Sequence, residues 1–151
     1  MSEEEKNQLD EKLSLKLFVV LTRALDAVRK SIEKEIRTYG LNPTEFAVLE
    51  LLYNKGEQSA QKIGEKVLIA SSSITYVVDK LEKKDLILRT HYPEDRRIIN
   101  VSITDAGRKM MDEIFPIHTQ GVQRILEGLD TKEKEEMISQ LKKLGMYAKN
   151  R

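Results

Sequence analysis

The sequence contains no cysteine among its 151 residues. Without thiols the chain cannot form disulfides, sense oxidants through thiol chemistry or bind zinc through cysteine ligands. It has two histidines, His91 and His118, which are far apart in the sequence. Two such residues are too few for a histidine-rich metal site within one chain. We therefore expect no metal and no cofactor.

Long apolar runs and a secretory signal are also absent. No stretch approaches the roughly eighteen consecutive apolar residues that suggest a membrane-spanning helix. The chain begins with the acidic residues Glu3, Glu4 and Glu5, where a signal peptide would have a basic segment followed by an apolar one. We expect a cytoplasmic protein with no membrane partner.

The common catalytic motifs are missing as well. The sequence has no glycine-rich dinucleotide fingerprint, no phosphate-binding P-loop, no H-E-x-x-H zinc motif and no G-x-S-x-G nucleophile motif. Carboxylates are plentiful, but they stand among lysines on predicted helices, which is typical of solvated surface. We therefore expect a protein that is not an enzyme.

The net charge of +1 carries no information about nucleic acid, and the distribution of charge carries little. Residues 1–12 have five acidic and two basic side chains, whereas residues 59–104 have eight basic and six acidic ones. The basic excess in the second segment is modest. On its own it does not indicate a DNA-binding surface.

What the sequence does contain is helical periodicity. Charged residues make up 34% and apolar residues 40% of the chain, a mixture typical of a helix-rich globular protein. Apolar residues recur at three- and four-residue steps over 12–38, which predicts one long amphipathic helix of about 40 Å. Such a helix needs a partner surface, supplied either by a second subunit or by the core of a monomer.

The segment 42–104 combines short helices with a hairpin. Asn42, Pro43 and Glu45 fit the N-cap, N1 and N3 positions of a capping box. Helices are then predicted over 60–67, with Ser59 as N-cap, and over 71–84, joined by a tight turn. In the second of these helices we expect four residues to face the core: Ile74, Val77, Val78 and Leu81. Two helices joined in this way form a helix-turn-helix unit.

After Leu86 the apolar period changes from helical to alternating. Two alternating segments flank Pro93-Glu94-Asp95, which predicts a two-stranded hairpin with a charged tip. A hairpin that follows a helix-turn-helix is a wing. The fold class is therefore mainly α with a small β-hairpin wing.

Two further helices are predicted at the C-terminus. Thr104 caps the first, over 105–127, in which Pro116 is expected to produce a bend. Asp130 and Glu133 form a capping box that opens the second. With no internal repeat and no low-complexity linker, we expect a single domain over 1–151. Its winged helix-turn-helix region, 42–104, is flanked by dimerisation helices over 12–38 and 105–149.

Small hydroxyl side chains cluster with a tyrosine in the N-terminal half of the helix over 71–84. These residues are Ser71, Ser72, Ser73, Thr75 and Tyr76. Hydroxyl groups donate to phosphate oxygens and reach base edges, and a helix N-terminus favours anions. The alternative is that one serine caps the helix and the others are solvated. We interpret the cluster as a DNA-binding face, with Ser59 and Lys80 as further contacts.

The predicted wing tip carries Arg96 and Arg97 beside Asp95. A positive side chain on a hairpin tip can enter the minor groove, where the negative potential attracts it. The alternative is a solvated charged turn. We expect Asp95 to form an ion pair with Arg97 and to orient its guanidinium.

Together these features resemble the MarR family of regulators. That family has the pattern D-x-R-x5-[L/I]-T-x2-G across the wing and the start of the next helix. Here the pattern is matched by Asp95, Arg97, Ile103, Thr104 and Gly107, and the segment SSSITYVVDKLEKKDLI resembles the family's recognition helix. The resemblance covers nearly the whole chain. One departure is Asp85, where the family commonly has glycine, although aspartate tolerates a left-handed conformation.

The resemblance implies a homodimer that binds double-stranded DNA at a pseudo-palindromic operator. Each subunit would place a recognition helix in the major groove and a wing at the minor groove. It also implies a repressor released by a small ligand, often phenolic or aromatic. Candidate ligand-binding residues are Leu17, Leu21, Tyr53, Met110, Met111, Ile114 and His118, for which core packing is the alternative role. A protein-interaction module that does not bind DNA is the alternative function.

Overall fold

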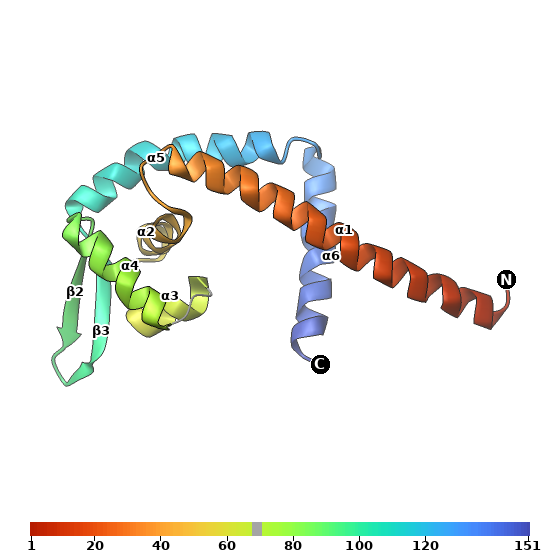
Figure 1. Cartoon of the computed structure of the whole chain (residues 1–151), viewed down its shortest axis with the longest axis horizontal. Coiled ribbons are helices and arrows are strands. Elements are labelled where there is room, and N and C mark those ends of the chain that lie inside the picture. The colour runs from red at the N-terminus through yellow and green to blue at the C-terminus, as the bar shows by residue number, and fades with distance from the viewer. Residues whose placement is uncertain (68–70) are drawn as a thin grey trace. The chain divides into compact units, whose positions relative to one another are not determined.

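The computed structural model describes residues 1–67 and 71–151, with the side chains of Ser71 and Ser72 outside that description. Helices and strands follow one another along the chain as shown in Figure 1. The elements are α1 (Glu3–Arg37), α2 (Pro43–Lys55), β1 (Gln58–Ser59), α3 (Ala60–Val67), α4 (Ser71–Lys83), β2 (Ile87–Tyr92), β3 (Asp95–Ile103), α5 (Asp105–Ile125) and α6 (Thr131–Lys149). The predicted mainly helical fold with a β wing is confirmed.

The chain divides into two compact units. One comprises Met1–Val28 with Gln120–Arg151, and the other comprises Arg29–Thr119. The helices α1 and α5 each contribute to both units. The second unit contains the predicted winged helix-turn-helix region. The predicted tight turn between α3 and α4 falls on residues 68–70, outside the described residues.

The wing differs from the predicted two-stranded hairpin by one strand. The described strands form a three-stranded antiparallel sheet in the order β1-β3-β2, in which Gln58 pairs with Val101 and Ile87 pairs with Ile103. The strand β1 has only two residues, too few to show an alternating pattern. Ser59 nevertheless caps α3 as predicted, since its hydroxyl accepts a hydrogen bond from the Lys62 N–H at 3.2 Å.

The helix α1 begins well before the predicted residue 12. Ser2 forms a capping box with Glu5, in which the Glu5 N–H donates to the Ser2 hydroxyl at 3.2 Å and the Ser2 N–H donates to the Glu5 carboxylate at 3.3 Å. Acidic residues in the first turn also suit the positive end of the helix dipole. These first turns are polar, so the apolar periodicity could not reveal them.

The hydrophobic core lies in the unit Arg29–Thr119. It joins α2, α3, α4, the sheet and the start of α5 around residues with almost no exposed surface, among them Leu49, Leu52, Ile63, Leu81, Ile87, Val101 and Met111. The four residues of α4 that were predicted to face the core are all buried. The prediction of which face of α4 points inward is therefore confirmed.

The unit Met1–Val28 with Gln120–Arg151 leaves many large apolar side chains exposed. On α1 these are Leu9, Leu13, Leu15, Leu17, Phe18, Val19, Val20 and Leu25, and on α6 they are Met137, Ile138, Leu141, Leu144, Met146 and Tyr147. Leu15 is 73% exposed and Phe18 is 70% exposed. Exposed apolar surface on this scale marks an interaction site, because isolated monomers rarely leave so much uncovered.

The C-terminal end of α4 is closed by a left-handed residue. Asp85 has a φ of 61°. The Leu86 N–H donates to the Leu81 carbonyl at 3.1 Å and the Asp85 N–H donates to the Glu82 carbonyl at 2.9 Å. This is the Schellman pattern, in which glycine is usual at the left-handed position. Aspartate takes that role here, as the sequence comparison with the MarR pattern indicated.

The same end of α4 is bonded to the start of α5. The Thr104 hydroxyl donates to the Asp85 carbonyl at 2.7 Å, and the Thr104 N–H donates to the Leu86 carbonyl at 3.1 Å. That hydroxyl also accepts from the Gly107 N–H at 3.0 Å, so the predicted helix cap is confirmed. A Cβ on Gly107 would lie 2.2 Å from the Leu86 carbonyl oxygen, which explains why this position has glycine. The β2–β3 hairpin extends away from this junction (Figure 1).

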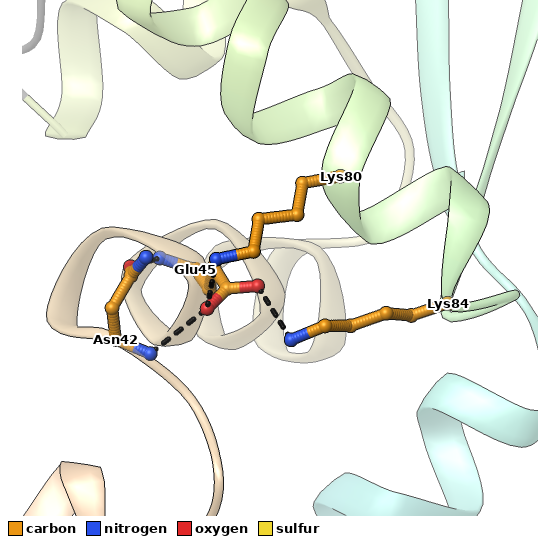
Figure 2. Close-up of polar contacts among 4 residues, drawn as sticks. All are labelled: Asn42, Glu45, Lys80 and Lys84. Carbon is orange, nitrogen blue, oxygen red and sulfur yellow. Dashed lines mark hydrogen bonds and ion pairs between the residues drawn. The ribbon is translucent and has the colours of Figure 1, made fainter.

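A buried carboxylate holds α4 from the side. Glu45 is 1% exposed, and its Oε2 accepts from the Lys84 ammonium at 2.9 Å while Oε1 lies 3.8 Å from that of Lys80. Figure 2 shows Lys80 of α4 and Lys84, which directly follows the last residue of α4, extending to this group on α2. Oε1 also accepts from the Asn42 N–H at 2.9 Å, and the Glu45 N–H donates to the Asn42 side chain at 2.8 Å, which completes the predicted capping box. One carboxylate therefore joins the first turn of α2 to α4.

The surroundings of Glu45 favour its ionised form. Burial opposes ionisation, but the hydrogen bond from Asn42 and the charges of Lys84 and Lys80 outweigh it and hold the pKa of the carboxyl below its ordinary value. A carboxyl whose pKa is lowered by folding stabilises the native state above its unfolded pKa. That contribution is lost as the pH falls through the native pKa.

Replacing Gly107 with alanine should destabilise the protein by about 1–3 kcal/mol, because the added methyl group forces apart the backbones of α5 and Leu86. Gly128→Ala is the control. Gly128 lies between α5 and α6, and an added Cβ would have no atom within 4 Å, so the stability should stay within ~0.5 kcal/mol of the wild type. Chemical denaturation at fixed protein concentration measures both. Equal effects of the two substitutions would show that the close approach at Gly107 does not matter.

Glu45→Gln should reduce the free energy of unfolding at neutral pH by about 1–2 kcal/mol, since it removes the charge that both lysines face. The difference in the free energy of unfolding between this variant and the wild type should narrow as the pH falls below the ordinary glutamate pKa of 4.5 toward the lower native pKa. Denaturation curves across this pH range measure it. Glu57→Gln, on an exposed side chain, is the control and should stay within ~0.5 kcal/mol of the wild type. A Glu45→Gln deficit that persists unchanged in acid would contradict the ionic role.

Candidate DNA-binding surface

The outward face of α4 has the residues that the sequence placed there. Ser73, Thr75 and Tyr76 are exposed, and Tyr76 is 68% exposed. The side chains of Ser71 and Ser72, which belong to the same predicted face, lie outside the described part of the chain. The helix therefore presents hydroxyl groups and one aromatic ring on the side opposite its buried residues. Such groups suit contacts to phosphates and base edges.

Lys80 has a second role beside the predicted one. Its side chain is 42% exposed, and its ammonium also forms an ion pair with Glu45 (Figure 2). Lys84, for which no role was predicted, makes the shorter contact to the same carboxylate. Contact of Lys80 with a phosphate stays a prediction. The structure adds that the loss of this lysine would also remove a partner of Glu45.

The predicted ion pair at the wing tip is present. The Arg97 guanidinium donates from Nε to Asp95 Oδ1 and from Nη2 to Asp95 Oδ2, each at 3.0 Å, and the Arg97 backbone N–H also donates to Oδ1. The side-chain hydrogen bonds lower the pKa of Asp95 and raise that of Arg97. Arg97 is 90% exposed, and Arg96 is exposed beside it. The tip therefore presents two guanidinium groups, one of them held by a bidentate ion pair.

A charged cluster between α4 and β2 was not predicted. The Nη1 atom of Arg89 lies 2.6 Å from Oδ1 of Asp79, and its Nη2 donates to Oε1 of Glu82 at 2.9 Å. The hydrogen bond from Arg89 lowers the pKa of Glu82, and the same bond to Glu82 raises the pKa of Arg89. The signal available in the sequence was two carboxylates three positions apart on a helix, followed by an arginine in the next strand. Nothing in the periodicity says that these side chains meet.

An aromatic cluster surrounds His118. Its ring centroid lies 4.5 Å from that of Phe46, 6.2 Å from that of Phe115 and 6.3 Å from that of Tyr39. Nε2 is 3.6 Å from a carboxylate oxygen of Glu50. Nδ1 is buried and has no hydrogen-bond partner among the described residues. This is a polar ring in an apolar environment with one nitrogen unused.

Tyr53 lies beside this cluster. Its hydroxyl donates to Asp112 Oδ1 at 2.5 Å, its ring is 5.7 Å from that of Phe115, and the Arg108 guanidinium lies 5.7 Å from its centroid. The hydrogen bond to Asp112 raises the pKa of the phenol.

The other candidate ligand-binding residues are distributed unevenly. Met111 and Ile114 are buried members of the core, and Met110 packs against it. Leu17 is 53% exposed, and Leu17 and Leu21 belong to the unit Met1–Val28 with Gln120–Arg151. For Met111 and Ile114 the burial fits the packing role. Binding of a ligand by any of these residues stays a prediction.

Residues 1–67 and 71–151 contain no cluster of three or more metal-ligating side chains. No helix in the same ranges combines the length and apolarity needed to cross a membrane.

Comparison with known proteins gives consistent matches. The MarR family model matches residues 41–99. The chain is 49% identical to the HTH-type transcriptional regulator MhqR of Bacillus subtilis over 136 residues, which cover 90% of this chain and 94% of that protein. It is 32% identical to the HTH-type transcriptional repressor MdtR of the same organism, over 72% of this chain and 68% of that protein.

Solved structures show the same fold. Bordetella bronchiseptica BpsR, whose DNA binding is regulated by 6-hydroxynicotinic acid, is 25% identical and has a TM-score of 0.77 over 86% of this chain and 98% of its own. A mutant E. coli MarR complexed with operator DNA is 17% identical, with a TM-score of 0.76 over 85% and 93% of the two chains. The chain therefore belongs to the MarR family of winged helix-turn-helix transcriptional regulators.

Proposed function

We propose that this regulator is a homodimeric repressor that binds a pseudo-palindromic DNA operator and is released by a small aromatic ligand. The DNA-binding part of the proposal is supported by the exposed face of α4, which carries Ser73, Thr75 and Tyr76. This face belongs to the same compact unit as the exposed arginines of the wing tip. This unit has its own core, so the helix and the hairpin are held on one scaffold.

In this proposal α4 enters the major groove with its hydroxyl-bearing face toward the bases. Serine and threonine hydroxyls can donate to or accept from base edges, and the Tyr76 ring offers an apolar surface with a polar end. Ser59, with its hydroxyl capping α3, and Lys80 contribute contacts to phosphates. The wing places Arg96 and Arg97 at the adjacent minor groove, with Asp95 restricting the orientation of Arg97.

The dimer is supported by the exposed apolar residues of α1 and α6. We expect a second copy of the chain to cover this apolar surface. A symmetric dimer would present two recognition helices about one helical turn of DNA apart, which matches an operator with two-fold symmetry. Burying these side chains against a partner removes a large apolar area from water.

The ligand is supported by the aromatic cluster and by the BpsR structure. The rings of Phe46, Phe115 and Tyr39 around His118 offer stacking surfaces, and His118 offers a buried Nδ1 without a hydrogen-bond partner among the described residues. A planar aromatic ligand with a hydroxyl group suits such surroundings. Regulation of BpsR by 6-hydroxynicotinic acid is consistent with a ligand of this class.

Thr75→Ala and Tyr76→Ala should each weaken operator binding by about 1–3 kcal/mol and alter the preferred sequence, because each removes a group from the base-reading face. Both side chains are exposed, so each substitution should change the free energy of unfolding by no more than ~0.5 kcal/mol. The melting temperature measures this change. Thr119→Ala, an exposed threonine on α5, is the matched control and should leave affinity unchanged. An operator selected from random duplexes serves as the probe. Normal affinity and sequence preference in both α4 variants would show that this face does not read DNA.

A further inference from the structure

The guanidinium of Arg89 contacts two carboxylates that both belong to α4. Nη1 lies 2.6 Å from Asp79 Oδ1, and Nη2 donates to Glu82 Oε1 at 2.9 Å. The backbone N–H of Arg89 donates to the second oxygen of Glu82 at 3.1 Å. This one residue of β2 therefore uses both its side chain and its backbone to hold acidic groups of the proposed recognition helix.

These carboxylates occupy a surface that faces a polyanion in the proposed complex. Asp79 comes three residues after Tyr76, so the two side chains are neighbours on the helix surface. The side chains of Asp79 and Glu82 are 44% and 34% exposed. A carboxylate near DNA repels phosphates and slows or weakens association. Two of them on a recognition helix call for a compensating charge.

Arginine is suited to this task by its shape. The planar guanidinium offers five donors in a rigid fork and can serve two carboxylates at once, whereas a lysine ammonium is a point charge on a flexible stem. Pairing with Arg89 reduces the local charge of the two acidic groups from −2 to −1. It also attaches the first strand of the wing to α4 close to the proposed DNA-contacting residues.

We propose that Arg89 is a positioning residue for DNA recognition: it holds Asp79 and Glu82 away from the phosphates and fixes β2 against α4. Arg89 acts through these carboxylates and makes no DNA contact of its own. This inference rests on the proposed DNA-binding function. It assigns a specific role to acidic residues that would otherwise oppose that function.

A double-mutant cycle tests the proposal by asking whether Arg89 matters only while its carboxylates are present. Four full-length proteins are compared on the selected operator: the wild type, Arg89→Gln, Asp79→Asn with Glu82→Gln, and the combination of all three substitutions. Arg89→Gln should weaken binding about tenfold, a coupling in the middle of the range seen for contacting residues. In the background without carboxylates, Arg89→Gln should change affinity less than about twofold.

Two controls separate this effect from loss of structure. Stoichiometric titration with operator gives the binding-competent fraction of each protein, so that a partly unfolded variant is not read as a weak one. Arg89→Lys, which keeps the charge but cannot bridge both carboxylates, should fall between the wild type and Arg89→Gln. The deficit of Arg89→Gln should also shrink as salt rises from about 50 to 200 mM, because exposed charges are then screened.

An equal loss from Arg89→Gln in both backgrounds would overturn the proposal, since it would show that Arg89 contacts DNA directly. A loss that salt does not reduce would also overturn it, since that result indicates a purely structural role. If the wild type binds no operator at low salt, the proposed function fails and this inference fails with it. If the wild type binds and the cycle shows no coupling, only this inference fails.

Discussion

The peptide groups around Leu86 are the constraint on which the rest of the winged unit depends. The Leu86 N–H closes the end of α4, its carbonyl accepts from Thr104 at the start of α5, and β2 begins at the next residue. Gly107 allows the backbone of α5 to approach this point. The helix α4, the wing and the start of α5 therefore meet within a few bonds. A movement at the start of α5 would be transmitted to the end of α4 through these hydrogen bonds, so the proposed ligand, bound near α5, would have a physical route to the proposed DNA-binding surface.

Two charge clusters complete the positioning of α4, and they have opposite compositions. On one side the buried carboxylate of Glu45 is shared by Lys80 of α4 and by Lys84, which directly follows the helix. On the other side the guanidinium of Arg89 is shared by two carboxylates of α4. The first cluster has an excess positive charge and the second an excess negative one. The helix is thereby attached to α2 and to β2 through charged groups, while its hydroxyl-bearing face stays exposed. An arrangement of this kind fixes the orientation of a recognition helix without using the side chains that would contact bases.

Local features could be predicted from the sequence, whereas contacts between distant residues could not. Periodicity identified the buried face of α4, and spacing identified the capping box at Asn42 and the Asp95–Arg97 pair, because these depend on residues within a few positions of one another. The contact of Glu45 with Lys84 joins residues 39 positions apart, and periodicity only places each of them in a segment predicted to be helical. The short strand β1 and the polar first turns of α1 were missed for a related reason, since neither contains an apolar repeat.

In the proposed complex, one dimer presents two copies of a winged unit, each with α4 in a major groove and the wing tip at the adjacent minor groove. Hydroxyl-radical and methylation footprinting on a selected operator tests this most directly. We expect two protected major-groove patches about 10 base pairs apart, flanked by minor-groove protection that disappears in Arg97→Ala. A single protected patch, or flanking protection that survives the loss of Arg97, would contradict it.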